Sequence, residues 1–275
     1  MGSIQDRVAL VTGAGQGIGR AIALKLAAEG ARVVVNDIDA EAAHETVEAV
    51  AKTGAAGVAV VGSVTEEGFA GRFVDTAMQR FGGLDIIVNN AGYTWDAVIQ
   101  RMTDEQWEAM LAVHVTAPFK ILRAAQPLIS RMHKAEREAG GRRTRKVVNI
   151  SSISGLDGNP GQANYSSAKA AVVGLTKTLS KEWGRYDVTV NAVAFGYIQT
   201  RLTQARSVAD GHISVEGHDI RVGMTDDRVS MLEEAIPMGR AGTPEEAAGA
   251  VYLFCSPESD YVSGETLVCG GGYHF

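Results

Sequence analysis

Short runs of apolar and β-branched residues recur along the chain, and the stretches between them carry apolar residues at helical spacing. Seven runs have the length and composition of β-strands: residues 8–12, 32–36, 57–61, 84–89, 146–151, 188–194 and 265–269. Strands that alternate with helices form a parallel sheet covered by helices on both faces. The pattern therefore predicts an α/β fold, a Rossmann-like doubly wound parallel sheet. Nothing in residues 1–275 is typical of a linker, so we expect a single domain that combines dinucleotide binding and catalysis.

A glycine-rich turn follows the first predicted strand and precedes a predicted helix. Its sequence is Gly13-Ala-Gly-Gln-Gly-Ile-Gly19. Glycines allow the backbone to turn sharply and to approach a ligand closely, and helix N-termini bind anions such as a pyrophosphate. The candidate ligand contacts are Gly13, Gln16, Gly17, Ile18 and Gly19. The spacing Gly-x-x-x-Gly-x-Gly fits the general dinucleotide fingerprint only approximately, so a turn without a ligand stays an alternative.

The second predicted strand ends at Asp37. A carboxylate about 20 residues beyond a glycine loop is placed to bind the ribose 2′-hydroxyl of NAD, and it would repel the additional phosphate of NADP. We therefore expect NAD(H) to be favoured over NADP(H). Asp37 could instead belong only to the N-terminal cap of the following helix.

Tyr165 and Lys169 lie four residues apart in a segment with helical character. That spacing places two side chains on one face of a helix, where an ammonium would favour the ionised form of a phenol. A phenol has an unperturbed pKa of about 10, so a lowered pKa would make Tyr165 a general acid/base near neutral pH. An exposed tyrosine–lysine contact is the alternative.

Composition excludes several classes of function. The 26 basic and 32 acidic side chains give a net charge of −6, a poor match for nucleic acid or an anionic membrane. We see no signal peptide and no apolar stretch of membrane-spanning length, so a cytoplasmic protein is expected. Cys255 and Cys269 have no metal-ligand spacing, and we expect two reduced thiols and no metal site.

Four motifs in order resemble the short-chain dehydrogenase/reductase family over nearly the whole chain. They are Thr12-Gly-Ala-Gly-Gln-Gly-Ile-Gly19, Asn89-Asn-Ala-Gly92, Ser152 and Tyr165-Ser-Ser-Ala-Lys169. Within the family, the chain looks most similar to the 3-oxoacyl thioester reductases. The resemblance implies that Tyr165 donates a proton to the substrate carbonyl, that Ser152 hydrogen-bonds the same oxygen, and that Lys169 binds the nicotinamide ribose.

The resemblance also implies further cofactor contacts. Asn90, Ala91 and Gly92 would line the adenosine side, and Ser63 with Val64 would lie beside the adenine. The segment from Gly196 to Thr200, which includes Ile198, would cover the nicotinamide and a phosphate. Gln16 stands where NADP-preferring relatives often carry arginine, which agrees with the preference for NAD. Against it stands the resemblance to the 3-oxoacyl thioester reductases, many of which use NADPH; we rank the local carboxylate of Asp37 above that family habit.

Three positions depart from the family pattern. His114 stands where the family usually carries an asparagine, whose main-chain carbonyl holds a water linked to the catalytic lysine. His114 offers the same main-chain carbonyl. Alternatively, its imidazole ring could titrate and take part in catalysis directly. Ser63 replaces an aspartate and would be a weaker, neutral partner for the adenine. Phe195 replaces a proline before Gly196, which should loosen that turn.

Residues 201–236 are long for a connection, and we expect a substrate lid there. The leading function is interconversion of a ketone and a secondary alcohol, with an acyl thioester as a possible substrate. A dehydrogenase of a cyclic, aromatic or steroid-like alcohol is one alternative, and a catalytically silent nucleotide-binding regulator is another. By resemblance to the family we expect a homotetramer.

Overall fold

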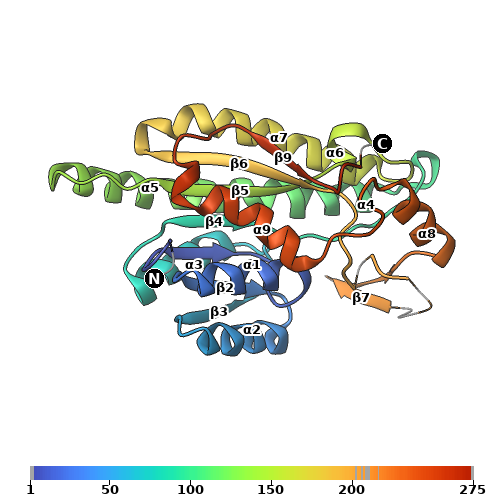
Figure 1. Ribbon diagram of the computed structural model, residues 1–275, viewed down its shortest axis with the longest axis horizontal. Coiled ribbons are helices and arrows are strands. Elements are labelled where there is room, and N and C mark those ends of the chain that lie inside the picture. Colours follow the sequence, from blue (N-terminus) through green and yellow to red (C-terminus); the bar gives the residue numbers. More distant parts are fainter. Residues whose placement is uncertain (1–2, 202, 206, 208–210, 216, 274–275) are drawn as a thin grey trace.

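A seven-stranded parallel sheet forms the centre of the computed structural model, which describes residues 3–201, 203–205, 207, 211–215 and 217–273. The strands lie in the order β3-β2-β1-β4-β5-β6-β9 (Figure 1). Their bounds are β1 Val8–Val11, β2 Arg32–Asp37, β3 Gly57–Val61, β4 Ile86–Asn89, β5 Arg145–Ser152, β6 Val188–Phe195 and β9 Thr266–Cys269. All seven predicted strands are confirmed, and the predicted Rossmann-like doubly wound architecture is confirmed with them.

Helices cover both faces of the sheet (Figure 1). One face is packed by α1 Gly17–Ala28, α2 Ala40–Lys52 and α9 Pro244–Cys255, and the other by α3 Phe69–Phe81, α5 Ala117–Glu138 and α7 Ala163–Trp183. Strand β1 shows why the strands appear in the amino-acid sequence as uninterrupted apolar runs. Ala9 and Val11 pack into the first layer, whereas Val8 and Leu10 pack into the second, because successive side chains point to opposite faces.

The shorter elements lie mainly between these layers and at the carboxyl ends of the strands. They are α4 Asp104–Leu111, a π-helical turn at Ala112–Thr116, α6 Ser154–Asp157, α8 Asp226–Ala235, and 3₁₀ turns at Ile99–Arg101, Gly184–Tyr186 and Pro257–Ser259. None of the helices in the described part of the chain combines the length and apolar composition of a membrane span.

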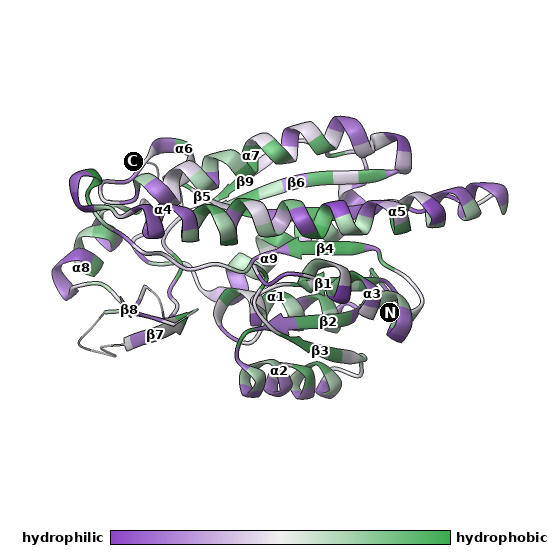
Figure 2. Cartoon of the chain, turned by 180° about the vertical axis from the view of Figure 1, so that it is seen from behind, coloured by the Kyte–Doolittle hydropathy of each residue, from purple (hydrophilic) through white to green (hydrophobic). Residues whose placement is uncertain are grey.

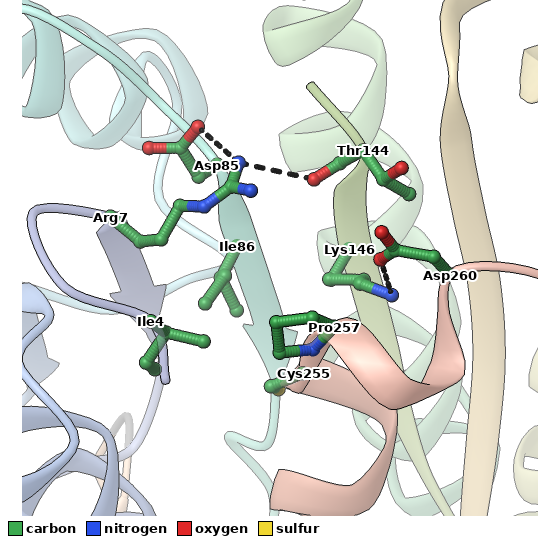
Figure 3. A pocket seen from close by; sticks show the side chains of 9 residues that line it. All are labelled: Ile4, Arg7, Asp85, Ile86, Thr144, Lys146, Cys255, Pro257 and Asp260. Atoms are coloured by element: carbon green, nitrogen blue, oxygen red, sulfur yellow. Dashed lines mark hydrogen bonds and ion pairs between the residues drawn. The ribbon is translucent and has the colours of Figure 1, made fainter. Parts of the chain in front are cut away.

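Residues 134–146 carry six basic side chains around Gly140-Gly141, a composition that could form a phosphate-binding patch but favours a solvated surface loop. In the structure, residues 134–138 belong to α5, and the end of the segment is buried. Strand β5 already begins at Arg145, which is only 1 % exposed and donates two hydrogen bonds to the Glu136 carboxylate. Lys146 is also buried, and its ammonium lies 2.7 Å from the Asp260 carboxylate, as Figure 3 shows. The prediction of a surface loop is therefore wrong for these two residues, because the carboxylates of Glu136 and Asp260 neutralise their charges.

The lid region contains a hairpin that the sequence analysis did not predict. Strands β7 Gly211–Val215 and β8 His218–Val222 pair antiparallel and form a sheet of their own. Gly217 stands in the turn with φ 87°, a conformation that favours glycine. The hairpin lies on the side of the main sheet where its parallel strands end (Figures 1 and 2).

Candidate active site

The glycine-rich turn lies where the strand order reverses, between β1 and β4. Helix α1 begins at Gly17, and within the described residues no side chain caps its first turn. A methyl group added at Gly17 would meet only the Thr200 side chain, at 3.8 Å, so the bare backbone faces open space. These features fit the pyrophosphate of a dinucleotide, which the free N–H groups of a helix N-terminus would bind.

Asn90 and Thr12 fix the shape of this turn. The Asn90 side chain donates hydrogen bonds of 2.9 and 3.1 Å to the carbonyl oxygens of Thr12 and Gly13. The Thr12 hydroxyl in turn accepts from the backbone N–H groups of Asn90 and Ala91. Gly13 leaves no room for a side chain, since a Cβ there would lie 2.8 Å from the Ala91 Cα. The amide of Asn90 thus braces the turn, and Ala91 and Gly92 continue along its edge.

Asp37 lies at the end of β2, beside the turn. One of its carboxylate oxygens accepts a 2.8 Å hydrogen bond from the backbone N–H of Gly15, and the other accepts from the Asp39 N–H at 3.1 Å. The helix cap itself is Asp39, whose side chain accepts from the first turn of α2. Asp39 is thus the cap residue of α2, whereas the Asp37 carboxylate joins the glycine-rich turn to the backbone just before that helix.

The remaining candidate cofactor residues follow the carboxyl ends of β1, β3 and β6 in the chain. The Ser63 hydroxyl lies 2.7 Å from that of Thr65, and Val64 is buried in the core. Ile18 packs against the core layer under α1, and Ile198 is buried beside it. The Thr200 side chain is the nearest neighbour of the open side of Gly17, and its hydroxyl lies 3.1 Å from that of Thr203.

The turn at Gly196 is firmly held, which corrects the expectation that Phe195 loosens it. Phe195 is paired with Cys269 in the sheet, and the Gly196 N–H donates to the Cys269 carbonyl at 2.9 Å. The Phe195 carbonyl accepts from the Ile153 N–H. Any side chain at Gly196 would come within 2.7 Å of the Gly270 Cα. Strand pairing therefore supplies the restraint that a proline ring would otherwise provide.

Ser152, Tyr165 and Lys169 come together beyond the end of β5. Ser152 is the last residue of that strand, and its hydroxyl donates to the Phe195 carbonyl and accepts from the Ser154 N–H. Tyr165 and Lys169 lie on one face of α7, with the Lys169 ammonium 5.5 Å from the centre of the Tyr165 ring. The Ser152 hydroxyl contacts the Tyr165 phenol and lowers its pKa.

The Lys169 side chain is buried and hydrogen-bonded to the backbone of β5. It is 4 % exposed, and its Nζ donates a 2.8 Å hydrogen bond to the Ile150 carbonyl. Gly155 makes room for it, because a Cβ at that position would lie 2.6 Å from the Lys169 Cβ. Burial lowers the pKa of Lys169 to about 7.

The pKa of Tyr165 moves in the direction opposite to the expectation from the Tyr165–Lys169 spacing. Burial raises the pKa of Tyr165 to about 12, and the nearby Asp96 charge adds to that rise, although the Ser152 contact lowers it. Lys169 is not among the causes of this change, and the expected lowering of the Tyr165 pKa does not occur among the protein's own residues, because burial disfavours the charged forms of both groups.

Comparisons with known proteins agree with this geometry. A family model described as enoyl-(acyl carrier protein) reductase matches residues 13–274. The 3-oxoacyl-[acyl-carrier-protein] reductases of Synechocystis and Thermotoga maritima are 36 % and 34 % identical to this chain, over 99 % and 98 % of it and 98 % of each relative. The chain belongs to the short-chain dehydrogenase/reductase family. A solved structure from Sinorhizobium meliloti, titled a putative short-chain alcohol dehydrogenase, superposes with a TM-score of 0.84 at 29 % identity, covering 98 % of this chain and 97 % of that one.

As a short-chain dehydrogenase/reductase, this protein is an NAD(P)-dependent oxidoreductase that acts on CH–OH groups. The described residues contain no cluster of three or more histidine, cysteine or acidic side chains that could hold a metal ion.

His114, the departure from the family pattern, lies in the π-helical turn that joins α4 and α5. Its Nε2 is 2.8 Å from the Tyr93 carbonyl oxygen, and its ring meets the Tyr165 ring edge-on, with centres 5.1 Å apart. The structure thus brings His114 into contact with Tyr165.

Two polar residues near Tyr165 were missed by the sequence analysis. Desolvation raises the pKa of the Asp96 carboxyl, although a 2.8 Å hydrogen bond from the Gln162 amide acts the other way. Asn164, fully buried, donates to the carbonyl oxygens of Trp95 and Gln106 and so fixes the loop that carries Asp96. No motif marks Asp96, because only the fold places it beside α7.

The β7–β8 hairpin contacts the loop and the helix that lie beside this region. The His218 ring lies 4.6 Å from the Trp95 ring, and its Nε2 is 3.5 Å from the Glu105 carboxylate of α4. Ile220, from the same strand, is 5 % exposed and packs into the core layer that contains Tyr93. The hairpin therefore has specific contacts with the loop that borders the catalytic residues.

Proposed function

We propose that this protein is an NAD(H)-dependent reductase of 3-oxoacyl thioesters that also catalyses the reverse oxidation of the secondary alcohol. The observation that carries the proposal is the meeting of Ser152, Tyr165 and Lys169 beyond a dinucleotide-binding turn. The names of the relatives, which act on acyl-carrier-protein thioesters, supply the substrate class.

The bound nicotinamide would exchange a hydride with the substrate carbon. Tyr165 donates its phenolic proton to the carbonyl oxygen during reduction, and Ser152 donates a hydrogen bond to the same oxygen. Burial raises the pKa of Tyr165, so the phenol is protonated near neutral pH and can donate that proton during reduction. Lys169 would bind the nicotinamide ribose, and its positive charge would stabilise the tyrosinate that forms after proton transfer.

Asp37 supports the preference for NAD(H). Its carboxylate is held beside the turn by Gly15 and Asp39, where the adenosine ribose of a dinucleotide would lie. A 2′-phosphate there would meet a negative charge, and Gln16 offers no cation to compensate it. We therefore infer that NADPH binds more weakly than NADH.

The other proposed cofactor contacts come from residues that follow the carboxyl ends of β3, β4 and β6. The backbone of Ala91 and Gly92 would line the adenosine side, and Ser63 with Val64 would border the adenine. Gly196, Ile198 and Thr200 would cover the nicotinamide and a phosphate.

We expect the protein to act as a homotetramer in the cytoplasm. Helices α5 and α7 leave apolar and small side chains exposed, among them Phe119, Ala170 and Ala171. Such faces suit helix-to-helix contact between subunits, and light scattering of the purified protein tests the subunit number. The cytoplasmic location remains a prediction from the sequence.

The deciding experiment measures the oxidation of NADH and of NADPH at 340 nm. Acetoacetyl thioesters of coenzyme A and of acyl carrier protein are compared with a panel of cyclic, aryl and steroid ketones. Fast turnover of a thioester with NADH supports the proposal, whereas turnover of only the other ketones would identify a specialised alcohol dehydrogenase. NADH binding without turnover of any ketone would identify a silent nucleotide-binding regulator.

A further inference from the structure

Lys169 is joined to two consecutive residues of β5 by hydrogen bonds that run in opposite directions. Its Nζ donates to the Ile150 carbonyl at 2.8 Å, and its own main-chain carbonyl accepts from the Ser151 hydroxyl at 2.9 Å. Ser151 is 1 % exposed, so this second bond lies in the interior. The two bonds therefore fix both the side chain and the main chain of Lys169 against the strand.

Helix α6 packs against Lys169 as well. A Cβ added at Gly155 would lie 2.6 Å from the Lys169 Cβ and 2.9 Å from the Ala170 nitrogen. The backbone of α6 therefore approaches that of α7 at this residue as closely as only a glycine allows. Lys169 cannot move relative to β5 without losing one of these contacts.

The hydrogen bond from Ser151 joins the two elements that carry the candidate catalytic residues. Ser152 follows Ser151 directly at the end of β5. Tyr165 lies one helical turn before Lys169 in α7. The separation between the strand and the helix therefore sets the distances among the three reacting groups. A displacement of about 1 Å in such a site can reduce the rate by about 10²-fold.

The Ser151 hydroxyl contributes little to stability by its bonding pattern. A carbonyl inside a helix already accepts a hydrogen bond from the N–H four residues later. The Lys169 carbonyl would therefore keep a donor if the hydroxyl were removed, and no buried polar group would be left unsatisfied.

A second hydrogen bond between β5 and α7 has the opposite character. The Asn149 amide donates a 2.9 Å hydrogen bond to the Thr176 hydroxyl, and both residues are fully buried. Thr176 lies about two turns beyond Lys169, away from the reacting groups. Removal of its hydroxyl would take the acceptor from a buried amide, which destabilises a fold.

We propose that Ser151 is a positioning residue, which keeps Lys169, and the helix face that it shares with Tyr165, in register with the end of β5. The Ser151 hydroxyl donates its hydrogen to the Lys169 carbonyl, so Ser151 acts through Lys169 and not on the substrate. The inference rests on the proposed function, because Tyr165 and Lys169 must be the groups that act on the carbonyl oxygen.

Ser151→Ala tests the proposal. We expect kcat for the ketone to fall by about tenfold, because the reacting groups lose their fixed separation. The dissociation constant of NADH, measured by fluorescence titration, should change less than about twofold, and the melting temperature by less than about 2 °C. Thr176→Val should show the reverse, with a melting temperature lower by at least about 4 °C and kcat within about twofold of wild type.

Ser180→Ala is the matched control, because the Ser180 hydroxyl also donates a 2.9 Å hydrogen bond to a lysine carbonyl of α7, that of Lys177, at an exposed site. Its kcat and melting temperature should equal those of wild type. A wild-type kcat in Ser151→Ala would overturn the proposal. So would losses of kcat that follow the losses of melting temperature in Ser151→Ala and Thr176→Val, since reduced stability alone would then explain them.

The environment of Lys169 is measured without turnover by NMR titration of protein labelled with ¹³C-lysine, with the signal assigned by its absence in Lys169→Met. Burial lowers the pKa of Lys169 to about 7, and the other titratable groups beside it are Tyr165 of its own helix and His114 of the π-helical turn. Ser151→Ala should raise the titration midpoint by at least about half a pH unit, because a less firmly held ammonium is more hydrated.

Ser180→Ala should leave this midpoint at its wild-type value. An unchanged midpoint in Ser151→Ala would overturn the proposal even if none of the chosen ketones were turned over. A failure of the proposed function alone would leave the change of the midpoint as expected.

Discussion

The Asp37 carboxylate accepts a 2.8 Å hydrogen bond from the backbone N–H of Gly15, and a Cβ at Gly15 would lie 2.8 Å from the same carboxylate oxygen. The second glycine of the turn is thus required by the acid at the end of β2. The contact fixes the negative charge of Asp37 beside the turn, where the proposed function places the adenosine ribose.

Replacing Asp37 should change the cofactor preference. We expect the wild-type ratio of kcat/KM with NADH to that with NADPH to exceed about ten, which corresponds to about 1.4 kcal/mol. Asp37→Ser combined with Gln16→Arg should lower this ratio at least tenfold, because it removes the negative charge and supplies a cation for the phosphate. Asp39→Asn, a change in the cap of α2, is the matched control and should leave the ratio unchanged. A wild-type preference for NADPH would contradict the role of Asp37.

Tyr165→Phe should reduce turnover by about 10³-fold, because it removes the group that transfers the proton. The dissociation constant for NADH, measured by fluorescence titration, should change little. Ser152→Ala should reduce kcat by about 10²-fold through loss of one hydrogen bond to the developing negative charge. Tyr186→Phe, a change near α7 but far from Ser152, serves as the control. Near-wild-type turnover of Tyr165→Phe would show that another group donates the proton.

Lys169→Met should stabilise the protein at neutral pH and below, although it removes activity. The pKa of Lys169 is lowered to about 7 in the folded protein from 10.5, so the unfolded chain binds the proton more tightly. The charged lysine therefore destabilises the fold fully below about pH 7, and this effect disappears as the pH rises towards about 10.5. Melting temperatures of wild type and variant at pH 6.5 and pH 10 should differ more at the lower pH. An equal difference at both values would mean that Lys169 is not desolvated.

His218→Ala should weaken closure of the β7–β8 hairpin, because it removes both the ring contact with Trp95 and the pair with Glu105. We expect the KM for the ketone to rise by about threefold to tenfold, with the dissociation constant of NADH unchanged. His212→Ala is the control, since its partner is Asp219 within the hairpin itself. A similar KM in wild type and His218→Ala would mean that the hairpin does not cover the substrate.

The sequence by itself determined the seven strands, the dinucleotide turn and the shared helix face of Tyr165 and Lys169. Each of these depends on residues close together in the chain, and spacing is sufficient to predict them. Ser152 required the resemblance to the family, since a serine at a strand end has no spacing signal of its own. The antiparallel hairpin at Gly211–Val215 and His218–Val222 was missed, because its strands are short and only their mutual pairing defines them.

Only the tertiary structure decided the properties that depend on burial and on distant partners. The pKa of Tyr165 rises and does not fall, because burial of the phenol disfavours its charged form. Arg145 is buried because Glu136 pairs with it, and the turn at Phe195 is firm because Cys269 pairs with it. His114 is held by the Tyr93 carbonyl, a contact between segments that local sequence patterns do not connect.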